Sequence, residues 1–205
     1  RIQFDLPATG QEPVPIYPDI TYVQRYEFTL GSTRFELHHA EGEAEGYTYV
    51  FLPDQKILWV ADMLGPGMPM VASPMKRVRD ELRWKKALQL ILELEPEVLI
   101  NSVQAPICST DAIEKRVNVH IEYLDFLHEA VVREMNAGSS LQETLAHALL
   151  PEHLQSHPLL TQGYGCHDFN VRGLYHRYSG WFDQNASHLF PPPEDLQAKT
   201  FTELD

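Results

Sequence analysis

The stretch that decides the fold is Glu36–Asp62, which reads ELHHAEGEAEGYTYVFLPDQKILWVAD. It starts with a strand that carries two adjacent histidines and continues through a loop rich in Gly and Glu. Two apolar runs separated by a turn follow, and an Asp stands where the second run ends. Imidazole nitrogens and carboxylate oxygens at strand ends are ligands that divalent metals accept. The stretch therefore predicts a sheet whose edge carries a candidate metal site.

Other segments rich in β-branched and aromatic residues extend this sheet. We expect strands over Ile20–Leu30, Thr33–His39, Tyr47–Leu52, Ile57–Ala61 and Val98–Ile100. A helix is expected over Lys76–Leu94, where apolar residues recur at helical spacing and Pro96 follows. Residues 1–19 hold four prolines, a spacing that favours an extended arm.

After Cys108 the pattern becomes helical. Ser109 or Thr110 is expected to cap a helix that runs to about Asn136, and Ser140 with Glu143 forms a capping-box pattern for the next. A last helix is expected from Asp168 to about Phe182. The fold class is therefore α+β, with a sheet-bearing part over 1–108, a helical module over 109–192 and a polar tail over 193–205.

Charge, hydropathy and cysteine content exclude several classes of protein. The net charge is −13, which argues against nucleic acid or an anionic membrane surface as a partner. No apolar run approaches the roughly 20 residues that span a bilayer. Two cysteines without a Cys-x-x-Cys pair argue against a disulfide framework or a sulfur-ligated zinc site. A cytoplasmic location is the resulting expectation, with a periplasmic or secreted one left open.

Glu43 and Asp62 are the candidate metal ligands, because a hairpin between them would bring both carboxylates to one sheet edge. His39 is a candidate ligand or supporting residue. In the alternative reading, the acidic residues around Glu43 form a solvated turn and His39 is a hydrogen-bonded strand residue. His120 and His128 are expected to face water or an interface.

Two further segments could shape a pocket. Met63–Met75 contains three prolines and two glycines and is expected to be a loop, either ordinary packing or an adaptable apolar lid. The last predicted helix is rich in aromatic residues, which either pack into the core or line a substrate pocket. The candidate pocket residues on that helix are Arg172, Tyr175 and Tyr178.

The stretch ELHHAEGEAEGYTYVFLPDQKILWVADML resembles the second half of a metallo-β-lactamase-fold hydrolase of the alkylsulfatase-like branch. RVRDELRWKKAL (77–88) resembles a helix of that branch, and NVRGLYHRYSGWFDQNASHLFP (170–191) resembles its helical dimerisation module. The resemblance implies an αββα sandwich with one or two metals, usually zinc, and hydrolysis of an ester or sulfate ester by metal-bound hydroxide. It also implies dimer formation and a small-molecule substrate.

By position, the resemblance places Glu43 at a carboxylate ligand and Asp62 at the bridging carboxylate. The chain departs from the family pattern elsewhere. The His-x-His-x-Asp-His motif is absent from the 205 residues, Tyr47 stands where many relatives carry a second glutamate, and the position of a final metal histidine falls within Asn101–Pro106. Tyr47 is therefore a candidate ligand or supporting residue.

Two explanations for the departures stay open. The chain is expected to be the C-terminal part of a hydrolase whose N-terminal half lies on the same or a partner chain; half a sandwich would then expose an apolar sheet face. Alternatively the chain is a non-catalytic subunit or a pseudoenzyme that pairs through the helical module. The missing final histidine favours the second explanation, since a separate N-terminal half does not account for it.

Overall fold

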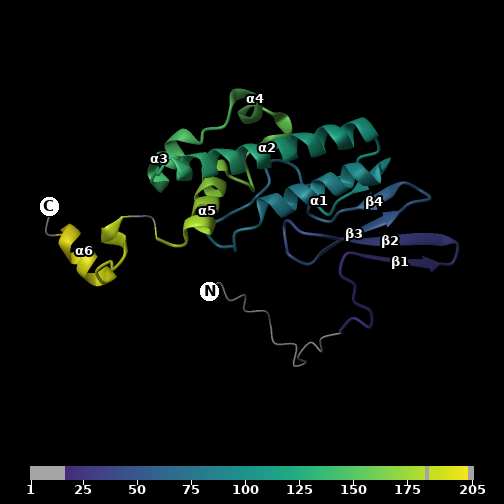
Figure 1. The fold of residues 1–205 in the computed structure, drawn as a ribbon, viewed down its shortest axis with the longest axis horizontal. Coiled ribbons are helices and arrows are strands. Elements are labelled where there is room, and N and C mark those ends of the chain that lie inside the picture. The colour runs from purple at the N-terminus through teal and green to yellow at the C-terminus, as the bar shows by residue number, and fades with distance from the viewer. Residues whose placement is uncertain (1–16, 183–184, 203–205) are drawn as a thin grey trace.

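A computed structural model of the protein describes residues 17–182 and 185–202. Most of the extended arm predicted over residues 1–19 lies outside this part of the chain. Within it, five strands form one mixed sheet, one helix lies between the fourth and fifth strands, and the other helices follow the fifth strand (Figure 1). The predicted change from strands to helices near residue 109 is therefore confirmed.

The sheet has the strand order β1-β2-β3-β4-β5. The first four strands pair antiparallel, whereas β4 and β5 run parallel and are joined by a crossover through helix α1. Each strand lies within or close to its predicted range, although β1 starts at Arg25 rather than Ile20. The strands are β1 (Arg25–Leu30), β2 (Thr33–Ala40), β3 (Tyr47–Leu52), β4 (Ile57–Trp59) and β5 (Val98–Ile100).

One face of the sheet is buried under α1 (Glu81–Leu94), on which α2 (Thr110–Asn136) packs as a second layer (Figure 1). Tyr49, Leu58 and Leu99 come from three neighbouring strands and are fully buried on this face. The Tyr49 hydroxyl donates a hydrogen bond of 3.2 Å to the backbone oxygen of Ala87 in α1. The sheet and both helices thus share one hydrophobic core.

The opposite face of the sheet is apolar and open. Tyr26, Leu37, Val50 and Trp59 face one another in one row across four strands. Trp59 is 52% exposed, and Leu30 at the end of β1 is 70% exposed. This is the exposed apolar face that the sequence leads us to expect of a half-sandwich.

Helix α1 begins later than predicted, at Glu81 rather than Lys76. Asp80 is its N-cap, because the side chain accepts a hydrogen bond from the Arg83 amide. Residues 76–79 stay outside the helix, so the Arg79 side chain reaches back to the β2–β3 loop. This start of α1 decides the geometry of the candidate site.

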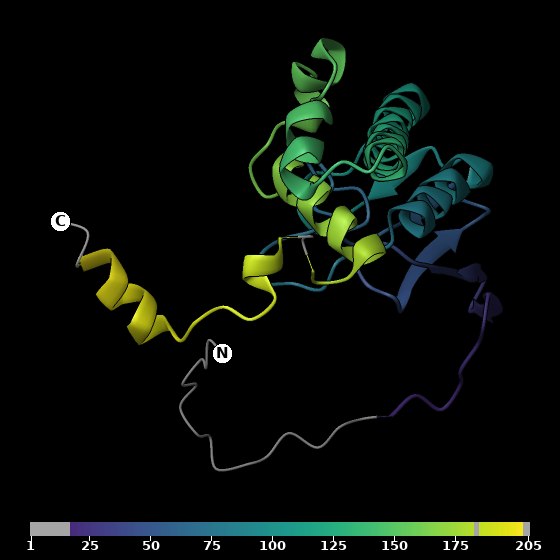
Figure 2. The same ribbon diagram turned by 60° about the vertical axis from the view of Figure 1, so that its left-hand side comes forward.

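Four shorter α-helices and two short 3-10 helices follow α2 in the described part of the chain. Ser140 and Glu143 form the predicted capping box, whereas the N-cap of the next long helix is Cys166 rather than Asp168. The predicted polar tail contains a helix, α6, which Figure 2 shows standing apart from the rest of the chain. The helices are α3 (Leu141–His147), α4 (Glu152–Gln155), α5 (His167–Ser179) and α6 (Glu194–Thr202).

Within the described ranges, each helix is too short or too polar to cross a lipid bilayer. The division of the chain at residue 109 stays a prediction. The hydrophobic core is continuous across that position, since it includes Leu88 from α1 as well as Leu127 from α2 and Leu174 from α5.

Candidate functional site

A pocket of about 380 Å³ lies between the β2–β3 loop, the turn after β4 and the Met-rich loop, which we define as residues 63–75. Its polar lining includes Glu43, Asp62 and Arg79. Its apolar lining includes Met63, Met68, Met70 and Trp84. The structure therefore brings the two predicted carboxylates to one pocket with an apolar wall.

Glu43 sits in the loop between β2 and β3 and is held from several sides. The Arg79 guanidinium forms an ion pair with the Glu43 carboxylate, and Arg79 Nε donates a 2.7 Å hydrogen bond to the Glu43 backbone oxygen. Lys76 Nζ lies 3.8 Å from Oε1, and the Tyr47 hydroxyl donates to Oε2 at 3.4 Å. Both carboxylate oxygens therefore have protein partners.

Arg79 binds two segments at once, because it also donates to the backbone oxygen of Met70 in the Met-rich loop. Its side chain is only 8% exposed. A buried guanidinium that bridges the β2–β3 loop and the Met-rich loop fixes the two walls of the pocket relative to each other.

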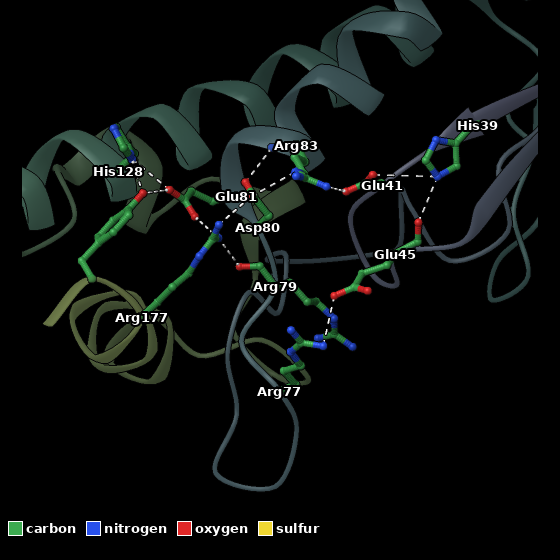
Figure 3. Close-up of polar contacts among 11 residues, drawn as sticks. His39, Glu41, Glu45, Arg77, Arg79, Asp80, Glu81, Arg83, His128 and Arg177 are labelled. Atoms are coloured by element: carbon green, nitrogen blue, oxygen red, sulfur yellow. Dashed lines mark hydrogen bonds and ion pairs between the residues drawn. The ribbon is translucent and has the colours of Figure 1, made fainter. Parts of the chain in front are cut away.

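Three ion pairs fasten the acidic loop to the segment before and at the start of α1. Glu45 pairs with Arg77 at 3.1 Å and Glu41 with Arg83 (Figure 3), and Glu43 pairs with Arg79. These residues line a second, strongly charged pocket of about 420 Å³. Glu41 and Glu43 are thus held by arginines, whereas Glu45 and its partner Arg77 are 80% and 87% exposed and lie in solvent.

Asp62 follows β4 in a tight turn and is exposed at the pocket. That turn is held to the sheet edge, since Val60 N donates to Ile100 O at 2.9 Å. The sequence expectation of a carboxylate at a strand end is met here, three residues beyond the last paired residue, Trp59.

Tyr47 lies between the two carboxylates. Burial, followed by the nearby charges of Glu43 and Asp62, raises the pKa of Tyr47 to about 12. The phenol is therefore neutral near pH 7 and acts as a hydrogen-bond donor to Glu43.

The two adjacent histidines lie away from the pocket. His39 Nε2 is 3.0 Å from the backbone oxygen of Glu45 and 3.9 Å from Glu41 Oε1. His38 Nε2 is 3.0 Å from Glu36 Oε2. The geometry gives His39 a hydrogen-bonding role in the β2–β3 loop, and its part in a metal site stays a prediction.

The described residues alone do not fit a zinc ion. Zinc in proteins takes three or four protein ligands. Over residues 17–182 and 185–202, no three His, Cys, Asp or Glu side chains lie close enough together to hold a metal. Glu43 and Asp62 supply one carboxylate each, and both oxygens of the Glu43 carboxylate already bind protein groups.

Sequence reasoning missed His120, which was expected to face water or an interface. It is 2% exposed and lines the pocket. Its ring nitrogens lie 2.8 Å from the Arg116 oxygen and 2.9 Å from the Gly67 oxygen. These carbonyls favour the charged ring, but burial outweighs them and lowers the pKa of His120 to about 4. The ring is thus neutral near pH 7 and donates one of the two bonds.

The segment Asn101–Pro106, where a final metal histidine was sought, forms a turn. Asn101 Oδ1 accepts hydrogen bonds from the amides of Val103 at 3.0 Å and Gln104 at 2.9 Å. Gln104 Oε1 accepts from Arg116 at 2.7 Å, and Val103 lines the pocket. This edge therefore contributes an apolar side chain to the pocket.

The three candidate pocket residues of the last helix lie elsewhere. Arg172 is exposed, and Tyr175 is buried with its hydroxyl donating to Ser139 O at 3.1 Å. The Tyr178 hydroxyl donates to Glu81 Oε1 at 2.6 Å, and burial together with Glu81 raises its pKa. A substrate role for these residues stays a prediction, and the structure does not place them in the lining of the pocket with Glu43.

A buried network that the sequence did not reveal surrounds Glu81, the first residue of α1. Glu81 is fully buried and accepts hydrogen bonds from Arg177 at 2.9 Å and from Tyr178 (Figure 3). His128 Nδ1 lies 2.9 Å from the same carboxylate. The network joins α1, α2 and α5 beside Arg79.

Comparison with known proteins adds a relationship to this geometry. A family model described as alkyl sulfatase dimerisation matches residues 140–204. A linear primary-alkylsulfatase from a Pseudomonas strain is 26% identical over 92% of this chain and 36% of its own length. An (R)-specific secondary-alkylsulfatase from Pseudomonas is 28% identical over 98% of this chain and 31% of its own.

The fold agrees with these relatives. The solved structure of the stereoselective inverting sec-alkylsulfatase Pisa1 from Pseudomonas matches 92% of this chain with a TM-score of 0.83 and 27% identity, and covers 31% of that protein. The chain thus spans about a third of the proteins it matches. The predicted resemblance to alkylsulfatase-like proteins and the predicted α+β fold class are confirmed.

Proposed function

We propose that this chain is the C-terminal part of a sulfate-ester hydrolase of the alkylsulfatase type, and that the pocket between Glu43, Asp62 and the Met-rich loop takes the alkyl sulfate. One observation carries the proposal. In a chain that is similar to alkylsulfatases over 92% of its length or more, two strand-end carboxylates meet at one pocket with an apolar wall. An alkyl sulfate likewise has a polar head and a hydrocarbon tail, which match the polar end and the apolar wall of the pocket.

The apolar wall accounts for binding of the tail. Met68, Met70 and Trp84 are each less than 8% exposed and line the pocket. Each methylene group transferred from water to such a wall contributes about 0.8 kcal/mol. Unbranched methionine side chains also adapt to tails of different length.

Glu43 and Asp62 form the polar end of the pocket, and the Tyr47 hydroxyl supports Glu43 through a hydrogen bond. Ion pairing and hydrogen bonds fix the position of the Glu43 carboxylate. Asp62 is exposed, so its carboxylate can accept hydrogen bonds from a water molecule beside the ester. These residues orient water at the end of the pocket where the sulfate ester is hydrolysed.

The proposal includes one or two zinc ions, with Glu43 and Asp62 as ligands and His39 or Tyr47 as ligands or supporting residues. Since the described residues supply two carboxylates, the remaining ligands would come from elsewhere. Bound zinc would supply an acidified water molecule. Metal analysis of the purified protein, alone and with a candidate partner, tests this part; loss of zinc in Glu43→Ala and Asp62→Ala would support it.

A second candidate function is that of a non-catalytic subunit or pseudoenzyme. It is favoured by Val103, which brings an isopropyl group rather than an imidazole to the pocket, and by Gln104, which Arg116 binds. Such a subunit would bind an alkyl sulfate without releasing sulfate.

The proposed partners follow from two surfaces. We propose self-association through the module over 140–204, because the matching family model describes dimerisation. We also propose that a second sheet, from an N-terminal half on the same or a partner chain, covers the open face around Trp59 and Leu30. Small-molecule sulfate esters are the proposed substrates, with no role for nucleic acid or membrane.

Release of inorganic sulfate from decyl sulfate by the purified protein, with its partner if one is found, tests the activity. We expect Glu43→Gln and Asp62→Asn to lower the rate at least about 100-fold, in line with the loss of a group that acts in the transition state. Glu45→Gln is the matched control, since this acid of the same loop is 80% exposed and outside the pocket with Asp62. Decyl sulfate that binds but is not hydrolysed would favour the non-catalytic function.

A further inference from the structure

The Met-rich loop, residues 63–75, forms no helix or strand over its length and yet supplies most of the apolar wall of the pocket. Its inner part runs along residues 161–173, about a hundred positions later in the chain. Met68 N donates a 3.1 Å hydrogen bond to Thr161 O. The conformation of the wall therefore depends on the segment against which it lies.

Asn170 in α5 makes the principal polar contacts between the two segments. Its Oδ1 accepts a 2.9 Å hydrogen bond from the Ala72 amide, and its Nδ2 donates to Pro69 O at 2.8 Å. The second hydrogen on Nδ2 serves the Tyr123 hydroxyl of α2 at 2.7 Å. Asn170 is fully buried, and its two bonds to the loop bracket Met70.

The backbone of residues 165–173 also approaches the Met-rich loop closely at two glycines. A Cβ atom on Gly165 would collide with the backbone oxygen of Met68, and one on Gly173 would collide with the Cβ of Ala72. The two glycines thus allow the loop to lie directly on the start of α5. Tyr164, next to Gly165, itself lines the pocket.

We propose that Asn170 is the positioning residue for the apolar wall of the pocket, so that the helical module sets which alkyl tails fit. The identity of the ligand, an alkyl sulfate, rests on the proposed function. The position of the loop on Asn170 does not depend on it. Asn170 does not itself line the pocket; it acts through the backbone between Pro69 and Ala72. Without it, a buried amide and a buried carbonyl would lack partners, and the loop would rearrange to satisfy them.

Hydrogen exchange of the whole chain tests the geometry independently of any ligand. In Asn170→Ala we expect the amides of residues 70–72 to exchange at least about tenfold faster, while those of α1 keep their rates. Tyr123→Phe is the matched control, because it removes one hydrogen bond of Asn170 but leaves both bonds to the loop. Equal acceleration in the two variants, or acceleration spread over the whole core, would overturn the proposal.

A second variant serves if Asn170→Ala does not fold. Gly173→Ala pushes on Ala72 without removing a polar group, and the exchanged pair Ala72→Gly with Gly173→Ala returns the space. We expect faster exchange at residues 70–72 in Gly173→Ala and its reversal in the double variant. Persistence of the effect in the double variant, or no effect in either, would count against positioning by α5.

Binding of hexyl, octyl, decyl and dodecyl sulfate tests the consequence. In the unchanged chain each added methylene should tighten binding about fourfold. In Asn170→Ala or Gly173→Ala this increment should fall below about twofold, whereas Tyr123→Phe should keep it. An unchanged increment would overturn the proposal. If no alkyl sulfate binds the unchanged chain but the exchange result holds, the proposed function fails and the positioning role stands.

Discussion

Replacing Arg79 with methionine should test how the pocket is held together. This side chain is 8% exposed and binds the carboxylate and the backbone oxygen of Glu43 as well as the backbone oxygen of Met70. Methionine keeps much of the volume and removes every donor. The β2–β3 loop and the Met-rich loop would then lose the bonds that Arg79 makes to both, and would keep the 3.4 Å contact of the Glu43 amide with Met63 Sδ.

The expected loss of stability follows from the burial of the two partners. Breaking a buried ion pair by removing one member costs about 3–5 kcal/mol. Glu43 is 24% exposed and keeps a contact of 3.8 Å with Lys76, so the lower end of that range applies. We expect the free energy of unfolding to fall by about 3 kcal/mol.

Urea unfolding followed by circular dichroism measures this change, and Arg83→Met provides a matched control. Arg83 pairs with Glu41 of the same acidic loop but is 58% exposed, so its removal should cost much less stability than the removal of Arg79. The slope of free energy against urea concentration should be the same for both variants if only stability has changed.

A double-mutant cycle with Glu43→Gln isolates the ion pair. We expect a coupling energy of about 1.5–3 kcal/mol between Arg79 and Glu43. A loss in Arg79→Met as small as that in Arg83→Met, or a coupling near zero, would refute the view that this buried arginine holds the two walls of the pocket together.

Three other predictions concern single residues. Burial lowers the pKa of His120 from 6.5 to about 4. Between pH 6.5 and pH 4 the unfolded chain therefore binds a proton at this residue that the folded chain does not bind. The free energy of unfolding should fall by up to about 3 kcal/mol as the pH drops from 6.5 to 4. Urea unfolding of His120→Gln should show a weaker pH dependence, and a parallel decline would contradict this. Ser140→Ala should cost about 1 kcal/mol through loss of the capping box of α3, measured by thermal unfolding; no change would show that the cap is not stabilising. Trp59→Ser on the open sheet face should leave the free energy of unfolding of the isolated chain within about 0.5 kcal/mol. It should weaken binding of a partner that carries the second sheet in analytical ultracentrifugation, and a large loss of monomer stability would indicate that the chain itself buries Trp59.

The sheet could be predicted because its signals are local. Runs of β-branched and aromatic residues predict the strands over Thr33–His39 and Tyr47–Leu52, and the structure has β2 and β3 there. The capping residues Ser109 and Ser140 mark helix starts for the same reason. Asp80 was overlooked as a cap, because the apolar spacing continues upstream of it at Val78.

The site could be predicted in part. The resemblance placed Glu43 and Asp62 together, and they line one pocket. The supporting residues could not be found from spacing, because Arg79, His120 and Asn170 act on partners 36 to 101 positions away. One signal for the ion pairs of this loop was present in the sequence. Glutamates stand at every second position over 41–45, and arginines stand at 77, 79 and 83, where they pair with those glutamates.

The central claim is that Glu43 and Asp62 form the polar end of an alkyl sulfate pocket. A crystal structure of the protein with decyl sulfate tests it most directly. We predict the tail against Met68 and Met70 and the ester beside Asp62, in the pocket that these residues line. Decyl sulfate bound only at another surface, or with its head away from Asp62, would contradict the claim.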